Sequence, residues 1–587
     1  MNVNRLFDLP NYQLQNYAQP GMFVTKTNGN WEKVSTQEFV ILISEYSKGL
    51  IGLGIKPGDK VGLVSTNRYE WNVMDFAIQQ IGGIVVPLYP NISAKDYTYI
   101  FNDAKLKICV LGTEELFNTI NPILSQTPSV ESLFVFDSVK GTKSWTEIAN
   151  AGKDVKDEEV AELSKEIKKE DLATIIYTSG TTGNPKGVML SHGNLLSNVL
   201  SLLEPIPADN TSRVLTFLPI CHVYERMLHY LYIYLGCSIH FAESMETIGE
   251  NIKEVKPQVF SAVPRLIEKV FDKIMAKGDE LNGIKRRLFF WAVEIAEEYE
   301  MEGKGLIYGI KLAIARKLIF SKWQEALGGE VAAIASGSAA LQPRLARIFM
   351  AAGIPVLEGY GLSETSPVVS VNSFQRGIRF GSVGALIDDV EVKIDKDGEI
   401  LVKGPNVMMG YYNLPEETEK AIDADGWFHT GDIGNFIENK YLKITDRKKE
   451  IFKTSGGKYI IPQAMENKFK ESRFIEQIMV MGEGMKFPCA LIHPNIDFVK
   501  EWAKKKDFNI DVSTHESIVM DQRVVDRIQK EVDLFNAGFG QWEKIKRFAL
   551  LPNELSIDGG ELTPTLKLKR KIIKEKYLSQ YEGMYKD

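Results

Sequence analysis

The first 375 or so residues alternate short β-branched or aromatic runs with stretches of helical periodicity. This alternation constrains the fold most, because it is typical of mainly parallel sheets covered by helices. A capping box at Ser35 and Glu38 predicts the start of one such helix. The runs that we interpret as buried strands are 60–65, 83–87, 108–111, 133–136, 173–177, 214–218, 259–263 and 331–335. We therefore predict an α/β fold with stacked, parallel-rich sheets.

The last third of the chain has a different pattern of predicted secondary structure. Residues 391–394 and 399–403 flank Asp397-Gly398, a turn favoured in β-hairpins, and predict a β-rich subdomain over about residues 375–446. After Asp446, a charged stretch and a Gly-rich turn lead into an α+β pattern. We therefore predict a large N-terminal domain at 1–446 and a small, mobile α+β domain at 447–587.

Composition excludes several classes of protein. With 44% hydrophobic and 25% charged residues, the 587-residue chain can bury several cores and is not disordered. Its 70 basic and 77 acidic residues give a net charge of −7, which argues against a dedicated nucleic-acid binder. The four cysteines form no CxxC pair, so neither a zinc knuckle nor a secreted disulfide framework is expected.

The sequence predicts a cytoplasmic location. No apolar run approaches the roughly 20 residues of a membrane-spanning helix, and the N-terminus lacks the apolar core of a signal peptide. Residues 304–323 combine Lys311, Arg316, Lys317 and Lys322 with apolar residues, a composition suited to peripheral contact with a lipid surface. The same composition suits an ordinary helix packed on the protein with its lysines in water, so both interpretations stay open.

The predicted strand at 173–177 runs into a loop of glycine and hydroxyl residues that contains a lysine. Glycines let backbone N–H groups approach an anion, hydroxyls add donors, and an ammonium adds a mobile positive charge. The loop is therefore suited to hold phosphate, and its members are Thr178, Ser179, Gly180, Thr181, Thr182, Gly183 and Lys186. It is not a Walker A motif, because Gly180 and Gly183 are too close and a glycine follows Lys186.

Taken whole, residues 177–192 resemble the signature of the adenylate-forming superfamily, which includes acyl-CoA synthetases, luciferases and peptide-synthetase adenylation domains. Further motifs of this family follow in the expected order at 359–365, 430–432, 446–447 and 455–462, so the resemblance covers nearly the whole chain. It implies that a carboxylate attacks the α-phosphate of ATP to give an acyl-adenylate and pyrophosphate, and that a thiol then displaces AMP. Such catalysis rests mainly on positioning and electrostatics.

The resemblance also implies roles for residues in the nucleotide site. The loop that ends at Lys186 would hold the β- and γ-phosphates, and Tyr360, beside Gly361, would stack on adenine. Glu364 would bind Mg²⁺ and Thr365 would contact the α-phosphate. These residue types suit the tasks, because carboxylate oxygens bind magnesium, aromatic faces stack on purines and hydroxyls donate to phosphoryl oxygens.

Two further functions are implied for the ribose and the reacting centre. Asp432 would accept hydrogen bonds from the ribose hydroxyls, with Arg447 assisting. The segment at 562–570 resembles the one that carries the family's catalytic lysine, which its register places at Lys567, although Leu566 replaces the glycine of many relatives. Lys567 would neutralise charge that develops between the acyl carboxylate and the α-phosphate.

Relatives rotate the small C-terminal domain between the two half-reactions. The motif register places the hinge at Lys449. Rotation would remove Lys567 from the site and bring in Gly456 and Gly457, whose missing side chains leave room for the pantetheine arm of CoA.

Three details resemble long-chain fatty acyl-CoA synthetases in particular: the segments at 218–226 and 336–341 and the Thr-Pro-Thr-Leu-Lys ending. In relatives, His222 and the turn of Gly337, Ser338 and Ala339 border the acyl site. The resemblance thus implies a ligase that joins long-chain fatty acids to CoA, with ATP and Mg²⁺ required. Alternatives are a fatty acyl-AMP ligase that delivers to a carrier protein, a luciferase-like enzyme, and a non-catalytic nucleotide- and acyl-binding regulator.

Overall fold

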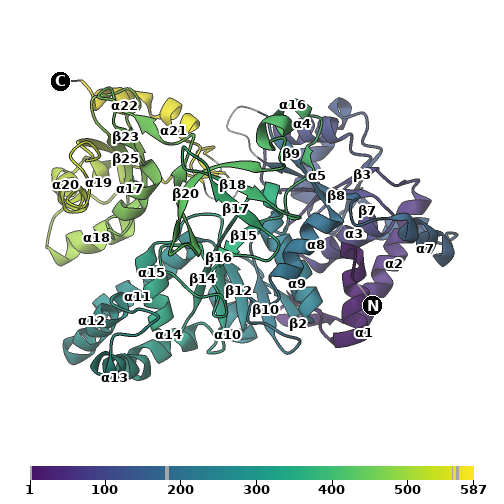
Figure 1. The fold of residues 1–587 in the computed structure, drawn as a ribbon, viewed down its shortest axis with the longest axis horizontal. Helices are drawn as coiled ribbons and strands as arrows, with labels where there is room; N and C mark the ends of the chain where they lie inside the picture. Colours follow the sequence, from purple (N-terminus) through teal and green to yellow (C-terminus); the bar gives the residue numbers. More distant parts are fainter. Residues whose placement is uncertain (1–2, 179–183, 558, 564–566, 587) are drawn as a thin grey trace.

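The computed structural model describes residues 3–178, 184–557, 559–563 and 567–586. These residues form a large N-terminal part and a small C-terminal domain that lies against one end of it (Figure 1). The predicted fold class is confirmed, since parallel-rich sheets with helices are followed by a small α+β domain.

The larger sheet has thirteen strands in the described part of the chain. In spatial order they are β17 (Glu391–Ile394), β18 (Glu399–Lys403), β20 (Phe428–Ile437), β21 (Tyr441–Arg447), β16 (Ala385–Leu386), β15 (Val368–Val371), β14 (Val356–Gly361), β13 (Ala333–Ser336), β12 (Val259–Ala262), β10 (Arg213–Thr216), β11 (Ser238–Phe241), β1 (Phe23–Thr27) and β2 (Asn30–Val34). The run from β14 to β1 is parallel, and the strands from β15 to β17 are antiparallel to their neighbours. The predicted hairpin, β17 and β18, therefore forms one edge of this sheet, and antiparallel strands join it to the parallel part.

A second sheet has eight strands among the described residues. Their spatial order is β19 (Gly410–Tyr411), β9 (Lys186–Ser191), β8 (Leu172–Thr178), β4 (Ile84–Leu88), β3 (Lys60–Val64), β5 (Ile108–Leu111), β6 (Ser132–Val135) and β7 (Lys143–Ser144). β8 and β9 pair antiparallel and bracket the phosphate loop, with Thr178 opposite Lys186. The eight predicted strands all occur, with bounds displaced by at most two residues, which is the usual uncertainty of strand ends.

Helices cover both sheets. In the N-terminal part they are η1 (Leu6–Asp8), α1 (Leu9–Tyr17), α2 (Thr36–Gly52), α3 (Tyr69–Gln80), α4 (Ala94–Ala104), α5 (Glu114–Ile120), η2 (Asn121–Gln126), α6 (Thr146–Ala151), α7 (Asp157–Glu166), α8 (His192–Ser201), α9 (Val223–Leu235), α10 (Ile248–Val255), α11 (Pro264–Glu280), α12 (Gly283–Glu297), α13 (Leu306–Ala315), η3 (Arg316–Phe320), α14 (Ser321–Ala326), α15 (Pro343–Ala351), η4 (Ser363–Thr365) and α16 (Pro415–Ala421). The capping box predicted before α2 is confirmed, because Ser35 and Glu38 each bond the other's backbone N–H.

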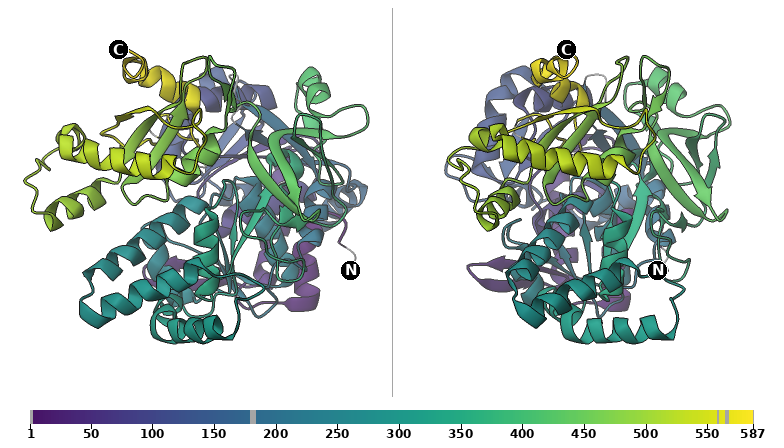
Figure 2. Two further views of the ribbon diagram at one scale, coloured as in Figure 1. Left: turned by 60° about the vertical axis from the view of Figure 1, so that its left-hand side comes forward. Right: turned by 90° about the vertical axis from the view of Figure 1, so that its left-hand side faces the viewer.

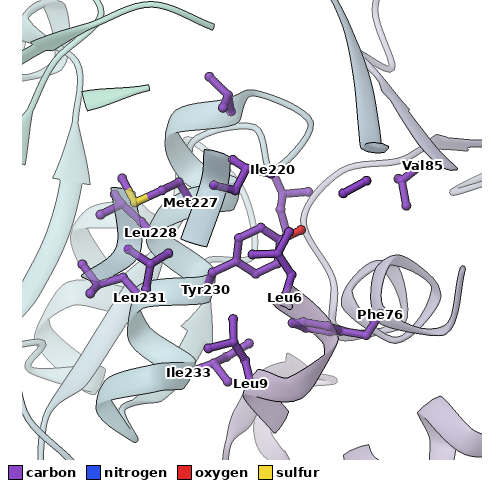
Figure 3. Packing of buried hydrophobic residues seen from close by; sticks show 14 of the residues in the cluster. Leu6, Leu9, Phe76, Val85, Ile220, Met227, Leu228, Tyr230, Leu231 and Ile233 are labelled. Carbon is purple, nitrogen blue, oxygen red and sulfur yellow. The ribbon is translucent and has the colours of Figure 1, made fainter. Parts of the chain in front are cut away.

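The largest core joins the two sheets. It contains buried residues of β3 and β4 from one sheet and of β10 and β11 from the other, packed against α9. Figure 3 shows Leu6, near the N-terminus, and Phe76 of α3 beside Tyr230 of α9. The Tyr230 hydroxyl donates to Asp75, which also pairs with the buried guanidinium of Arg226. This buried and satisfied polar cluster fixes α9, the helix that begins at His222.

The C-terminal domain has its own core. Its described elements are β22 (Phe452–Lys453), β23 (Tyr459–Ile460), α17 (Pro462–Phe469), β24 (Ile475–Met481), β25 (Cys489–Pro494), α18 (Ile496–Lys505), α19 (His515–Met520), α20 (Gln522–Asn536), β26 (Arg547–Leu550), α21 (Arg570–Lys576) and α22 (Leu578–Gly583). Across the described parts of both domains, no helix has both the length and the apolar character needed to cross a membrane.

Candidate active site

A cleft of about 2050 Å³ lies between the N-terminal part and the C-terminal domain. Thr178, Ser336 and Gly361 line it, and they end β8 of the smaller sheet and β13 and β14 of the larger one. Ligands of open α/β sheets bind beyond the carboxyl ends of strands, so the cleft lies where such a fold places its site. The C-terminal domain closes the opposite wall with the segment around Lys567.

The aromatic ring of Tyr360 and two charged side chains form one corner of the cleft. The Tyr360 hydroxyl donates to Asp432 Oδ2 at 2.7 Å, and Arg447 Nε lies 3.1 Å from Asp432 Oδ1. Asp432 and Arg447 face each other because β20 and β21 pair them directly. Next to Tyr360, a Cβ on Gly361 would come within 1.8 Å of the Pro367 carbonyl oxygen, so only glycine fits there.

Glu364 and Thr365 lie together in η4 but face different surroundings. Glu364 lines the cleft, and its Oε1 accepts a hydrogen bond of 2.9 Å from the Tyr411 hydroxyl. Thr365 is fully buried, and its hydroxyl donates to the Pro367 carbonyl. In this structure Thr365 therefore lies behind the cleft wall.

Glu364 is the predicted magnesium ligand. Among the described residues, no group of three or more His, Cys, Asp or Glu side chains could hold a metal ion. Mg²⁺ commonly binds through one or two carboxylates together with substrate phosphates and waters, so Glu364 fits that mode of binding. A dedicated all-protein magnesium cage does not fit.

Lys186 begins β9, directly opposite Thr178. Its Nζ lies 2.5 Å from Glu417 Oε2 on α16 and 5.0 Å from the centre of the Tyr411 ring. The ammonium groups of Lys186 and Lys420 lower the pKa of Glu417 to about 2. The predicted loop members Ser179, Gly180, Thr181, Thr182 and Gly183 lie outside the described residues.

Lys567 reaches the cleft from the C-terminal domain. Its backbone N–H donates to the Thr563 hydroxyl at 3.0 Å, and the Thr563 N–H donates back to its carbonyl at 2.9 Å. Burial, assisted by the positive charge of Arg447, lowers the pKa of the Lys567 ammonium to about 8, while Asp432 and Glu364 oppose the shift. Arg447, Asp432 and Glu364, which are distant from Lys567 in the sequence, thus all influence the pKa of its ammonium.

The predicted acyl residues also belong to the cleft. His222, Gly337, Ser338 and Ala339 all line it. His222 precedes α9 and accepts the Tyr224 N–H on its Nδ1 at 3.1 Å. Burial and the charge of Lys567 lower the His222 pKa to about 4, so the imidazole is neutral at pH 7. Apolar side chains that line the same cleft include Leu202, Ile206, Met227, Leu228 and Val371.

The predicted hinge and CoA residues lie apart from this arrangement. Lys449 is exposed in the turn that follows β21, at the rim of the cleft. Gly456 and Gly457 form the exposed turn between β22 and β23, where Gly457 has a φ of +74°. Neither glycine lines the cleft as it stands, so the structure brings Lys567 into the site and leaves the Gly-Gly turn outside.

Three residues of the site escaped the sequence analysis. Tyr411 and Glu417 contact Glu364 and Lys186, but they follow a weakly patterned segment far from both in the sequence. Glu358 is buried beside the acyl end and accepts the Leu341 N–H at 3.0 Å, and burial raises its pKa to about 8. A carboxylate within the apolar strand before Tyr360 is a signal that could have identified Glu358.

Ion pairs hold the C-terminal domain against the rest of the chain. Arg265 of α11 pairs with Glu476 of β24, and Asp279 lies 2.6 Å from Arg473. Within the domain, Arg570 is 3.0 Å from Glu450 and 2.7 Å from Glu466, close behind Lys567. These two ion pairs anchor the segment that carries Arg570.

Two family models match consecutive parts of the chain. Residues 13–412 match the model of the AMP-binding enzyme family, and residues 449–587 match that of the AMP-binding enzyme C-terminal domain. Tyr360 and Glu364 lie within the first match and Lys567 within the second, whereas Asp432 and Arg447 lie between the two.

Curated relatives align over nearly the full length. The chain is 32% identical over 564 residues to the long-chain-fatty-acid–CoA ligase FadD15 of Mycobacterium tuberculosis, covering 95% of this chain and 93% of that protein. It is 33% identical over 566 residues to long-chain-fatty-acid–CoA ligase 1 of Cavia porcellus, covering 91% and 79%.

Solved structures share the fold at lower identity. The adenylation domain of a carboxylate reductase from Mycobacterium chelonae superposes with a TM-score of 0.77 at 21% identity, covering 99% of this chain and 91% of that one. An anthranilate CoA ligase in complex with anthranoyl-AMP gives 0.73 at 16% identity, covering 99% of each chain. The two family models match most of the chain, and the curated relatives align over nearly its full length. The chain therefore belongs to the AMP-binding enzymes, the adenylate-forming superfamily that its motifs resemble.

Proposed function

We propose that this enzyme is an AMP-forming long-chain fatty acid CoA ligase that uses ATP and requires Mg²⁺. The observation that carries the proposal is the convergence of Lys567 with Glu364, Asp432 and Arg447 in one cleft. Relatives named as long-chain ligases at 32–33% identity support the substrate class.

In the first half-reaction, a carboxylate oxygen of the fatty acid attacks the α-phosphorus of ATP. The bond from the α-phosphorus to the bridging oxygen breaks, and pyrophosphate leaves with the electron pair. Lys567 stabilises the negative charge that gathers between the two anionic reactants. Tyr360 and Asp432 would hold the adenosine, with Arg447 fixing the carboxylate, and Lys186 would bind the outer phosphates once Glu417 releases it.

Mg²⁺, when bound, would neutralise phosphate charge, and Glu364 is the residue that would hold it. Tyr411 orients the Glu364 carboxylate through its hydroxyl. Contact of Thr365 with the α-phosphate stays a prediction, because its hydroxyl would first have to leave the Pro367 carbonyl.

In the second half-reaction, the thiol sulfur of CoA bonds to the acyl carbonyl carbon and the thiol proton passes to the solvent. The bond from that carbon to the phosphate oxygen of AMP breaks, and AMP leaves with the electron pair. We propose that the chain divides into domains at 446/447, with a β-rich subdomain at about 375–446, and that Lys449 is the hinge. Rotation there would withdraw Lys567 and bring Gly456 and Gly457 to the cleft. These glycines present no side chain that would block a pantetheine arm.

The acyl chain would lie along the apolar end of the cleft, beyond the Gly337-Ser338-Ala339 turn. The neutral imidazole of His222 and the buried Glu358 line the same cleft. A long alkyl chain gains from burial against Leu202, Met227 and Val371. Polar or short acids would leave this surface unfilled.

The test is pyrophosphate release with a series of acids from acetate to oleate, with and without CoA, and mass spectrometry of the acyl product. We expect acyl-CoA and AMP, with the highest kcat/KM for palmitate or oleate. Acyl-adenylate without acyl-CoA would replace the proposal by a fatty acyl-AMP ligase that delivers to a carrier protein. A maximum with short or aromatic acids would contradict the long-chain assignment, and AMP binding without turnover would indicate a regulator.

A further inference from the structure

An apolar stripe lies on the outward side of α13 and its continuation through η3. Its side chains are 44% to 82% exposed and belong to Leu306, Ile307, Ile310, Ile314 and Leu318. We call these five side chains the α13 stripe. They recur at helical spacing, so they form one continuous surface along about three turns of helix.

The stripe is additional to the packing of the helix on the protein. Leu312, Ala315, Phe320 and Trp323 are buried in a core that includes residues of α12 and α15. A helix packed in this way normally presents polar residues to water. Instead, the outward side is apolar, and a continuous exposed apolar surface marks an interaction site.

The charged side chains within the segment that carries the stripe are all positive, while the nearby Glu298 and Glu300 are paired with Lys304 and Arg347. Residues 306–324 contain no Asp or Glu, in a chain with 77 acidic residues and a net charge of −7. Lys311, Lys317 and Lys322 are exposed and have no ion-pair partner among the residues that the structure describes, whereas Arg316 donates to the Ala351 carbonyl. Lys311 lies four residues after Ile307 and Lys317 three residues after Ile314, so each lysine adjoins the stripe.

We propose that the α13 stripe is a docking surface for an anionic lipid bilayer. Its apolar side chains would enter the region between headgroups and acyl chains, and Lys311 and Lys317 would meet anionic headgroups. The helices of this region lie at the outer edge of the molecule, as Figure 1 and Figure 2 show, so a flat surface can approach them.

A second copy of the chain fits this surface less well. In a two-fold dimer the same patch meets itself, so the lysines beside the stripe would meet a surface that carries the same positive charges. Like charges at that distance repel, and the described residues 306–324 supply no carboxylate to separate them. A bilayer with negative headgroups has the complementary charge.

The experiment is flotation of the full-length protein with vesicles of phosphatidylcholine alone and of phosphatidylcholine mixed equally with phosphatidylglycerol. Two double variants probe the surface: Ile307→Glu with Ile310→Glu, and Lys311→Glu with Lys317→Glu. The control is Lys530→Glu with Leu534→Glu, because both side chains are exposed on α20 of the other domain and the substitutions are of the same kind. Thermal unfolding and pyrophosphate release show that each variant remains folded.

We expect the wild-type protein and the control to float with anionic vesicles and to remain unbound with phosphatidylcholine alone. Each basic residue near an anionic surface contributes a factor of about five, so the lysine variant should lose at least about tenfold in partitioning. Equal flotation of all variants, or no flotation of the wild type, would overturn the proposal. So would a lipid-free dimer by light scattering that Ile307→Glu with Ile310→Glu converts to a monomer.

Discussion

Lys186 of the phosphate loop and Glu417 of α16 form an ion pair with 2.5 Å between Nζ and Oε2, although 231 residues separate them in the sequence. The lysine that the triphosphate would bind is therefore already paired with a carboxylate. Under the proposed function, ATP would have to displace Glu417 from Lys186. Lys420 could then retain Glu417, because its Nζ is 2.8 Å from the same carboxylate.

Replacing Glu417 by Gln should lower the KM for ATP. The pair is partly exposed and such pairs are weak, so the expected decrease is no more than about fivefold, with kcat little changed. The measurement is ATP–pyrophosphate exchange over a range of ATP concentrations. Glu419→Gln, on the exposed side of the same helix, is the control. A raised KM would mean that Glu417 positions Lys186 for the nucleotide instead of competing with it.

Replacing Lys567 by Ala should slow adenylation strongly. Loss of a single charge-stabilising donor costs about 3 to 4 kcal/mol, or roughly a hundred- to thousandfold in kcat. ATP–pyrophosphate exchange measures this step alone. Lys546→Ala, an exposed lysine of the same domain, should leave the rate unchanged. Comparable exchange by Lys567→Ala and the wild type would remove Lys567 from the mechanism.

The pH dependence of adenylation should follow the same ammonium. Because burial lowers the pKa of Lys567 to about 8, kcat/KM should fall above that pH as the charge is lost. Lys567→Arg keeps its charge, so its profile should stay flat through pH 9 even if its rate is lower. A wild-type profile without a decline up to pH 10 would contradict this prediction.

The lowered pKa of Lys567 also affects stability, but raising the pH then favours the folded state. From about pH 8 to 10.5, the folded state binds fewer protons at Lys567 than the unfolded state does. The unfolding free energy from this group therefore rises with pH across that window. The alanine variant lacks the buried charge at all pH values. The melting temperatures of the wild type and of Lys567→Ala should therefore approach each other as the pH is raised.

Most of the fold could be predicted from local patterns. Buried parallel strands are short apolar runs, so β5 and the hairpin strands β17 and β18 appear in the sequence with their correct bounds. The order of strands could not be predicted, because neighbours such as β4 and β8 pair across about 85 intervening residues. That pairing depends on side chains from distant segments fitting together.

Some residues of the candidate site could likewise be predicted from the sequence, and others could not. Tyr360, Glu364 and Asp432 belong to recognisable motifs, and the structure places all three in the cleft. Tyr411 and Glu417 have no motif, since their importance arises only from contact with Glu364 and Lys186. Contacts of this kind depend on tertiary packing, which local sequence does not encode.

Replacing Lys449 by Pro should separate the two half-reactions. No hydrogen bond from the Lys449 N–H occurs within the part of the chain that the structure describes, so proline removes no contact of the adenylating arrangement. Proline fixes φ and restricts the preceding Lys448, and it should therefore oppose rotation at this turn. Single-turnover measurements of adenylate formation and of acyl transfer to CoA should show a much larger loss in the second step. Lys449→Ala, which removes the side chain and keeps the backbone free, should retain both rates, and equal losses of the two steps in Lys449→Pro would place the hinge elsewhere.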